Sequence, residues 1–249
     1  MGLKNRLRRS LAPAVRHISA RAIPAALGYP AIRDNVMKAL AADPTLESIP
    51  PLQAKHLDDA RLFANRNDLI SSMRSVIEGG VIAEVGVAQG DFSEFLLQEL
   101  EPTKFVAFDI FNMHEWGAAW GDSTSNVLNN MTHLEFYRRR FADRGTQITI
   151  EVGMSHLNLA NYPDKSFDLI YIDADHSYEG VKKDAEIAKN KVSDDGFIVF
   201  NDYMRFDHVY GYFYGVVRAV NEIIVNDNWL ICGFALQPEM YCDIAIHKR

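Results

Sequence analysis

The sequence predicts an α/β protein built on a mostly parallel sheet, and three observations support this prediction. The apolar run 81–85 ends in a glycine-containing turn and leads into the amphipathic segment 92–100, a pattern typical of a buried strand that turns into a helix. Polar residues follow several apolar runs, at the sheet edge where α/β proteins bind ligands. Two final runs, 229–236 and 240–247, are expected to form a hairpin. Other apolar runs alternate with segments of helical periodicity, at 104–110, 147–152, 167–173 and 196–200.

Length and composition limit the possible functions. The chain has 249 residues, enough for one α/β domain with an N-terminal extension, and its formal net charge of -7 argues against general nucleic-acid binding. Its two cysteines, Cys232 and Cys242, lie in apolar segments without zinc-site spacing. We therefore expect a reduced, cytoplasmic protein. No apolar run in the sequence approaches the length of a transmembrane helix.

The N-terminal segment differs from the rest of the chain in charge. Residues 1–33 carry lysines and arginines without one acidic residue, and leucines recur there at helical spacing. One interpretation is an interfacial helix that makes weak contact with an anionic membrane surface. The alternatives are a mobile arm and a helix that packs on a partner subunit.

Helices are expected before the first strand, over 32–40, 54–64 and 67–77. We therefore divide the chain into a basic arm with a helical cap, residues 1–64, and a main domain, residues 65–249. His56, Arg61 and Arg66 could reach a substrate pocket from this region, although solvated helix faces explain them equally well.

The turn after the first apolar run reads Glu84-Val-Gly86-Val-Ala-Gln-Gly90. Its glycines let the backbone approach a ligand that side chains would exclude. A dinucleotide-binding fingerprint requires a third glycine where this chain has Asp91, and the Gly-Lys-Ser/Thr of a phosphate loop is missing. Glu84 lies inside an apolar strand, where an unpaired carboxylate is costly, so we expect a nearby group to satisfy it.

Asp109 ends the next apolar run, 23 residues after Gly86. A carboxylate at such a strand end can accept hydrogen bonds from both hydroxyls of a ribose. The alternative is a helix N-cap, a position in which aspartate is common. We favour the ribose, because the strand end and the spacing agree.

The connection after Asp109 contains two tryptophans and a cluster of arginines. Trp116 and Trp120 lie in a glycine-containing loop and suggest a lid or a wall of the substrate site. A helix is expected over 125–142, and we interpret its run of three arginines, 138–140, as a solvated helix end.

Polar side chains follow two later strands. Asp173, Asp175 and His176 come directly after one apolar run, and Asn201 and Asp202 follow the next. Because neighbouring parallel strands lie about 4.8 Å apart, these oxygens can converge on one cation. Oxygen ligands with room for water suit Mg²⁺, Ca²⁺ or Mn²⁺ rather than zinc.

Taken in order, these motifs resemble those of class I S-adenosylmethionine (SAM)-dependent methyltransferases, and most closely the small bacterial macrocin and cephalosporin-type O-methyltransferases. The resemblance covers residues 65–249. It implies a Rossmann-like fold with a seven-stranded, mostly parallel sheet, helices on both faces and an antiparallel last strand. SAM is then expected across the carboxyl ends of the first four strands.

The resemblance also implies roles for single residues. The divalent cation, in the metal-dependent relatives, is held by residues matching Asp173, Asn201 and Asp202, although catechol-type enzymes have Asp-Asn where this chain has Asn-Asp. The catalytic base is either His176, at the position of the catechol-type lysine, or Asp175. The turn after 147–152 is expected to contact the adenine. Together, the SAM-binding residues are expected to be Glu84, Gly86, Gly90, Asp109, Met154, Ser155 and Asp173.

The resulting prediction is a metal-assisted, SAM-dependent O-methyltransferase acting on a small hydroxylated molecule such as a sugar, a glycoside or a secondary metabolite. One alternative is metal-independent O- or N-methylation with Asp175 or His176 as the base. Another is a catalytically silent scaffold with the same fold. The partners we expect are a small-molecule substrate and further copies of the chain, but no nucleic acid.

Overall fold

The computed structural model describes residues 48–207, 212–237 and 240–249. Residues 49–249 form one compact unit. The basic segment 1–33 and the expected helix 32–40 lie outside the described residues.

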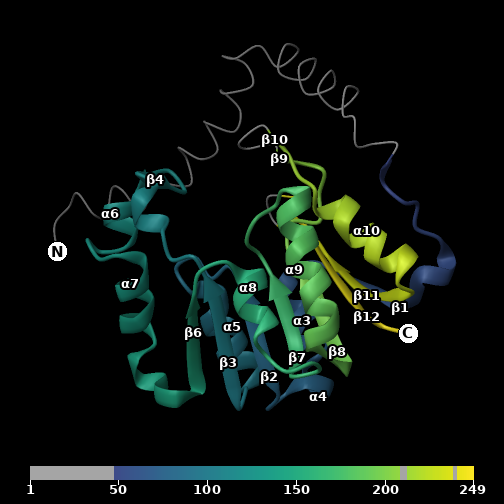
Figure 1. The fold of residues 1–249 in the computed structure, drawn as a ribbon, viewed down its shortest axis with the longest axis horizontal. Coiled ribbons are helices and arrows are strands. Elements are labelled where there is room, and N and C mark those ends of the chain that lie inside the picture. The colour runs from purple at the N-terminus through teal and green to yellow at the C-terminus, as the bar shows by residue number, and fades with distance from the viewer. Residues whose placement is uncertain (1–47, 208–211, 238–239) are drawn as a thin grey trace, which may run out of the picture. The chain divides into compact units, whose positions relative to one another are not determined.

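The compact unit is organised around one sheet of eight strands in the order β1-β11-β12-β8-β7-β2-β3-β6 (Figure 1). Strand β12 is antiparallel to both of its neighbours, and the other pairings are parallel. The predicted mostly parallel sheet and its closing hairpin are confirmed. The strands are β1 Leu57–Phe63, β2 Val81–Val85, β3 Lys104–Asp109, β6 Ile148–Val152, β7 Phe167–Ile172, β8 Val192–Phe200, β11 Trp229–Ala235 and β12 Asp243–Lys248.

Strand β1 is an eighth strand, where the sequence suggested a helix over 54–64. That helix prediction was wrong: only a 3-10 turn, η2 Ala54–His56, precedes the strand. Two of the large apolar residues of β1, Leu57 and Leu62, are 53% and 84% exposed, so the strand buries little apolar surface. Its backbone instead pairs with the free edge of β11. The division of the chain at residues 64 and 65 stays a prediction.

Helices cover both faces of the sheet, as predicted (Figure 1). Helices α8, α9 and α10 pack on one face, and α3, α4, α5 and α7 contribute to the apolar cluster on the other. Alternate residues of β2 divide between the two clusters, since Ala83 and Val85 face one and Ile82 faces the other. The helices are α3 Arg66–Ser71, α4 Arg74–Ile77, α5 Asp91–Leu100, α6 Thr124–Val127, α7 His133–Arg140, α8 Ser155–Ala160, α9 Tyr178–Lys191 and α10 Val216–Asn226.

The connection between β3 and β6 is more broken than predicted. The single helix expected over 125–142 is two helices, α6 and α7, because Asn129 and Asn130 adopt positive φ angles of 51° and 59° between them. Thr132 then caps α7 by accepting a hydrogen bond from the backbone N–H of Glu135. The shorter elements are η3 Met113–Glu115, η4 Ala142–Gln147 and the strand pairs β4 Ala118–Ala119 with β5 Asp122–Ser123, and β9 Phe206–Asp207 with β10 Tyr212–Phe213.

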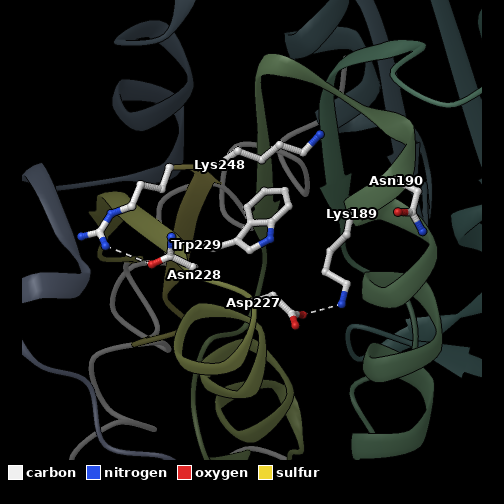
Figure 2. A pocket seen from close by; sticks show the side chains of 7 residues that line it. Lys189, Asn190, Asp227, Asn228, Trp229 and Lys248 are labelled. Atoms are coloured by element: carbon white, nitrogen blue, oxygen red, sulfur yellow. Dashed lines mark hydrogen bonds and ion pairs between the residues drawn. The ribbon is translucent and has the colours of Figure 1, made fainter.

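A cavity of about 410 Å³ opens at the amino edge of the sheet (Figure 2). Trp229 begins β11, and Lys248 ends the antiparallel β12, so both lie at this edge. The two lysines that line the cavity are paired with carboxylates, Lys189 with Asp227 at 2.5 Å and Lys248 with Asp194 at 3.4 Å. The cavity therefore lies at the edge opposite the polar residues that follow β2, β3, β7 and β8. Among the described helices, none is both long enough and apolar enough to cross a membrane.

Candidate active site

The glycine-rich turn between β2 and α5 has a backbone that only glycine accommodates easily. Gly86 and Gly90 have φ angles of +85° and +82°. A Cβ atom added to Gly86 would lie 1.9 Å from the carbonyl oxygen of Asp173, so the end of β2 approaches the end of β7 without room for a side chain. A backbone cradle of this kind fits a ligand that lies across the carboxyl edge of the sheet.

Glu84 lies beneath this turn and is satisfied internally. It is 2% exposed and accepts a hydrogen bond from the hydroxyl of Ser93, which in turn accepts one from the hydroxyl of Tyr137 at 2.9 Å. Burial raises the pKa of Glu84 well above its ordinary value. The expected partner of this buried acid is therefore Ser93 on α5.

Asp109, at the end of β3, braces the same turn. Its carboxylate accepts hydrogen bonds from the backbone N–H groups of Val87 at 2.9 Å and of Phe111 at 2.6 Å. Each carboxylate oxygen has a second lone pair, so Asp109 can still accept the hydroxyls of a ribose. The structure thus brings the predicted ribose acid beside Gly86, while its contact with ribose stays a prediction.

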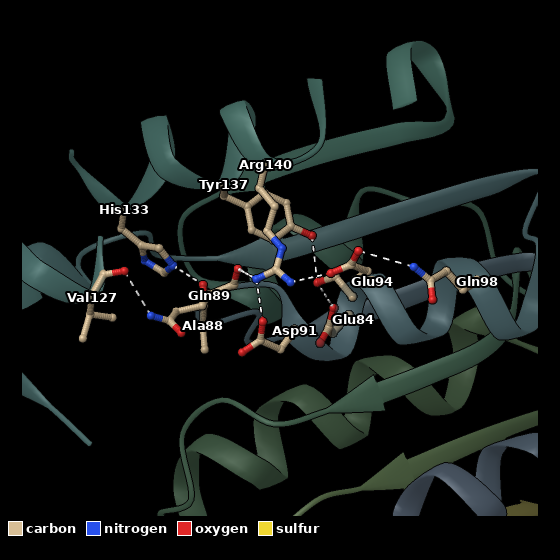
Figure 3. Close-up of polar contacts among 11 residues, drawn as sticks. Glu84, Ala88, Gln89, Asp91, Glu94, Gln98, Val127, His133, Tyr137 and Arg140 are labelled. Carbon is tan, nitrogen blue, oxygen red and sulfur yellow. Dashed lines mark hydrogen bonds and ion pairs between the residues drawn. The ribbon is translucent and has the colours of Figure 1, made fainter. Parts of the chain in front are cut away.

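Helix α7 closes over the turn through His133, a residue that the sequence analysis missed (Figure 3). His133 is 2% exposed, and its Nε2 lies 2.6 Å from the carbonyl oxygen of Ala88. Because a carbonyl oxygen only accepts hydrogen bonds, Nε2 is the donor in this contact. Nδ1 has no hydrogen-bond partner within the described part of the chain and lies 3.9 Å from Asp109 Oδ1.

The interpretation of the three arginines as a solvated helix end was wrong for Arg140. Its guanidinium contacts Asp91 and Glu94, each at 2.6 Å, and donates to the carbonyl oxygen of Gln89 at 2.8 Å (Figure 3). Positions 133, 137 and 140 share one face of α7, and that spacing is the signal that could have revealed the contact.

In the turn after β6, the two residues predicted to contact adenine have different environments. Met154 is 54% exposed at the start of α8. The hydroxyl of Ser155 instead donates to Asp184 on α9, a carboxylate that is 2% exposed. Met154 is therefore open to a ligand, whereas the Ser155 proton already has an acceptor.

His176 lies between two carboxylates at the ends of β7 and β8. Its Nε2 is 3.5 Å from Asp173 Oδ1 and 3.4 Å from Asp202 Oδ2, and its ring stacks on Tyr214 with centroids 4.6 Å apart. Burial lowers the pKa of His176, but the two carboxylates outweigh this effect, so the pKa is raised. Burial and the charge of Asp173 raise the pKa of Asp202 to about 7.

Asp175, the other predicted base, is engaged at the start of α9. Its Oδ1 accepts a hydrogen bond from the backbone N–H of Ser177 at 2.8 Å. Its carboxylate also packs against Gly180, where an added Cβ atom would lie 2.2 Å from Oδ2. The structure therefore places Asp175 two residues before Ser177, the N-cap of α9, with its carboxylate against the start of the helix.

Asn201, the third predicted metal ligand, is fixed by a hydrogen bond to a buried carboxylate. Its amide nitrogen donates to Asp243 Oδ1 at 2.9 Å, and the hydroxyl of Tyr171 donates to Asp243 Oδ2 at 2.8 Å. Within the residues that the structure describes, no group of three or more His, Cys, Asp or Glu side chains is placed to hold a metal ion. The predicted metal site is not confirmed.

Comparison with known proteins assigns this part of the chain to a family. Residues 83–203, from the glycine-rich turn to the end of β8, match a family described as a methyltransferase domain. Residues 83–203 therefore form a methyltransferase domain. No curated protein matches the sequence.

Solved structures support the fold of this methyltransferase. A protein provisionally described as a caffeoyl-CoA O-methyltransferase from Staphylococcus aureus is 17% identical, with a TM-score of 0.51, over 84% of this chain and 91% of that chain. A protein provisionally described as an rRNA methylase from Clostridium thermocellum is 14% identical, with a TM-score of 0.52, over 74% and 96%. These similarities show the Rossmann-like methyltransferase fold.

Proposed function

We propose that the enzyme transfers the methyl group of SAM to a hydroxyl oxygen of a small molecule, such as a sugar, a glycoside or a secondary metabolite. The observation that carries this proposal is the position of His176, whose Nε2 lies within 3.5 Å of Asp173 and of Asp202. An imidazole beside two carboxylates can accept a proton and be stabilised once it is charged. The net charge of -7 favours a small acceptor over a nucleic acid.

The mechanism assigns a proton transfer to His176. The chemistry that SAM supplies when bound is an electrophilic methyl group on a sulfonium. His176 would accept the hydroxyl proton at Nε2 and so leave the acceptor oxygen free to attack the methyl group that SAM would supply. Asp173 and Asp202 then stabilise the imidazolium by charge. The close backbone approach at Gly86 and the carboxylate of Asp109, fixed by its hydrogen bond from Val87, are consistent with SAM binding at this edge of the sheet.

The contacts of Asp175 at the start of α9 argue against Asp175 as the base. Its carboxylate accepts the N–H of Ser177 and packs on Gly180, so it helps to start the helix that follows His176. We therefore assign proton transfer to His176 and positioning of the helix to Asp175.

A divalent cation at Asp173, Asn201 and Asp202 fits by ligand type but not by space. Carboxylate and amide oxygens suit Mg²⁺. The imidazole of His176, however, lies between the two carboxylates, and the Asn201 amide is bonded to Asp243. No step of the proposed mechanism passes through a metal.

Calorimetric titration with SAM and S-adenosylhomocysteine, first with Mg²⁺ and then with EDTA, tests the proposal. We expect micromolar binding of both ligands and methyl transfer to hydroxylated acceptors under either condition. Loss of transfer in EDTA with intact cofactor binding would assign the carboxylates to a metal. Failure to bind either ligand would remove the cofactor assignment.

A further inference from the structure

Arg66 reaches the carboxyl edge of the sheet from the first turn of α3. Its Nη1 donates to the hydroxyl of Tyr171 at 3.2 Å and lies 3.9 Å from Asp173 Oδ2. Asp173 is also the residue whose carbonyl oxygen meets Gly86. The guanidinium therefore stands beside the glycine-rich turn, at the cofactor end of the site.

The guanidinium is rigidly held but has unused donors. Its Cζ atom lies 4.1 Å from the centre of the Phe92 ring, a cation–π contact, and Tyr171 fixes one edge. A guanidinium has five N–H groups, and only one donates in a hydrogen bond among the described residues. The nearest carboxylate oxygen, at 3.9 Å on Asp173, is beyond hydrogen-bond distance. The side chain is 30% exposed, so a ligand can reach it.

The charges around Arg66 match an amino-acid zwitterion. The methionine moiety of SAM carries an ammonium and a carboxylate on one carbon. Asp173 offers a negative charge for the ammonium, but the same charge would repel the carboxylate. Arg66 places a positive charge 3.9 Å from Asp173. This positive charge can attract the carboxylate of the methionine moiety, as Asp173 attracts its ammonium.

We propose that Arg66 binds the carboxylate of the methionine moiety of SAM, through the N–H groups that its contacts with Tyr171 and Phe92 leave free. This assignment rests on the cofactor site used in the proposed function. It makes Arg66 the residue that distinguishes SAM from nucleosides that lack an amino-acid carboxylate.

The test compares two ligands on matched variants of the full chain. S-adenosylhomocysteine carries the carboxylate, and decarboxylated S-adenosylhomocysteine keeps the ammonium but lacks it. In Arg66→Gln, affinity for the first ligand falls about 10-fold to 100-fold, while affinity for the second stays within about twofold. Arg61→Gln is the control, because Arg61 also lies over an aromatic ring, that of Phe63, but sits on β1, with three strands between it and β7.

Calorimetry distinguishes the outcomes. If the wild-type protein binds S-adenosylhomocysteine, two results would overturn the assignment: Arg66→Gln loses affinity for both ligands equally, or it loses affinity for neither. Absence of binding by the wild-type protein would instead remove the cofactor site itself. Arg66→Lys keeps the charge and retains part of the preference for the carboxylate. If Arg66→Gln does not fold, this preference in wild type and Arg66→Lys decides the matter, and a wild-type protein without it contradicts the proposal.

Discussion

At the scale of single residues, function depends on how buried polar groups are paired. Glu84 accepts a hydrogen bond from Ser93, and Asp243 accepts hydrogen bonds from Asn201 and Tyr171. These two acids therefore have a structural role. His176 is the contrasting case, since its Nε2 is buried and makes no hydrogen bond of good geometry within the described residues. A buried polar atom without a partner calls for a functional explanation, and the proposed proton transfer supplies one.

Replacing His176 with asparagine should abolish catalysis and spare cofactor binding. We expect kcat to fall about 100-fold to 10,000-fold, because a positioned base contributes that much to a proton transfer. Affinity for S-adenosylhomocysteine, measured by calorimetry, should stay within about twofold. The matched variant Asp175→Asn should lose far less activity. If the two variants exchange these results, Asp175 is the base.

The pH dependence of the reaction follows from the two carboxylates. A base must be neutral to accept a proton, and Asp173 and Asp202 raise the pKa of His176 above its ordinary value of about 6.5. The acid limb of kcat/KM should therefore fall as pH decreases through a pKa above 6.5. In Asp173→Asn the limb should move to lower pH, because one stabilising charge is lost. An unchanged limb would contradict the assignment.

At the scale of elements, the turn between β2 and α5 joins three parts of the fold. It contacts the end of β7 through Gly86, the end of β3 through Asp109 and helix α7 through Ala88. Helix α7, in the connection between β3 and β6, adds contacts from His133 and Arg140. The cofactor edge is thus held by segments far apart in the sequence.

Replacing Gly86 with alanine should disrupt this junction. The new Cβ would meet the Asp173 carbonyl oxygen at 1.9 Å and would also occupy a positive-φ position. We expect a loss of about 2–4 kcal/mol in unfolding free energy and loss of S-adenosylhomocysteine binding. Gly117→Ala is the control, because Gly117 has a φ of +73° but nothing within 4 Å of an added Cβ. Similar melting temperatures in the two variants would show that the close approach of Gly86 to Asp173 does not contribute to stability.

At the scale of the whole molecule, stability is distributed from the centre of the sheet outward. Strands β2, β7 and β8 are covered on both faces, whereas β1 lies at an edge with most of its residues exposed. Such an edge strand opens without exposing much apolar surface.

Hydrogen exchange followed by mass spectrometry should reveal this gradient. Amides of β2 and β7 should exchange slowest, and those of β1 fastest among the eight strands. Bound S-adenosylhomocysteine should slow exchange in the glycine-rich turn and leave β1 unchanged. Protection of β1 equal to that of β7 would show that the eighth strand belongs to the cooperative core.

The sequence by itself determined the architecture and the residues of the carboxyl edge. Apolar runs, positive-φ glycines and acids at strand ends are local signals, and they predicted β2, Gly86, Asp109 and Asp173 because local chemistry controls those positions. Only the tertiary structure decided that β1 is a strand, since its pairing depends on the free edge of β11.

The tertiary structure also decided which side chains meet. His176 lies between Asp173 and Asp202 because β7 and β8 are neighbours, and Arg66 reaches Asp173 across more than 100 residues of sequence. His133 meets Ala88 in the same way. Such distances follow from packing and not from spacing along the chain. The pattern of residues therefore predicted the reaction class, whereas only the fold decided which side chains lie together.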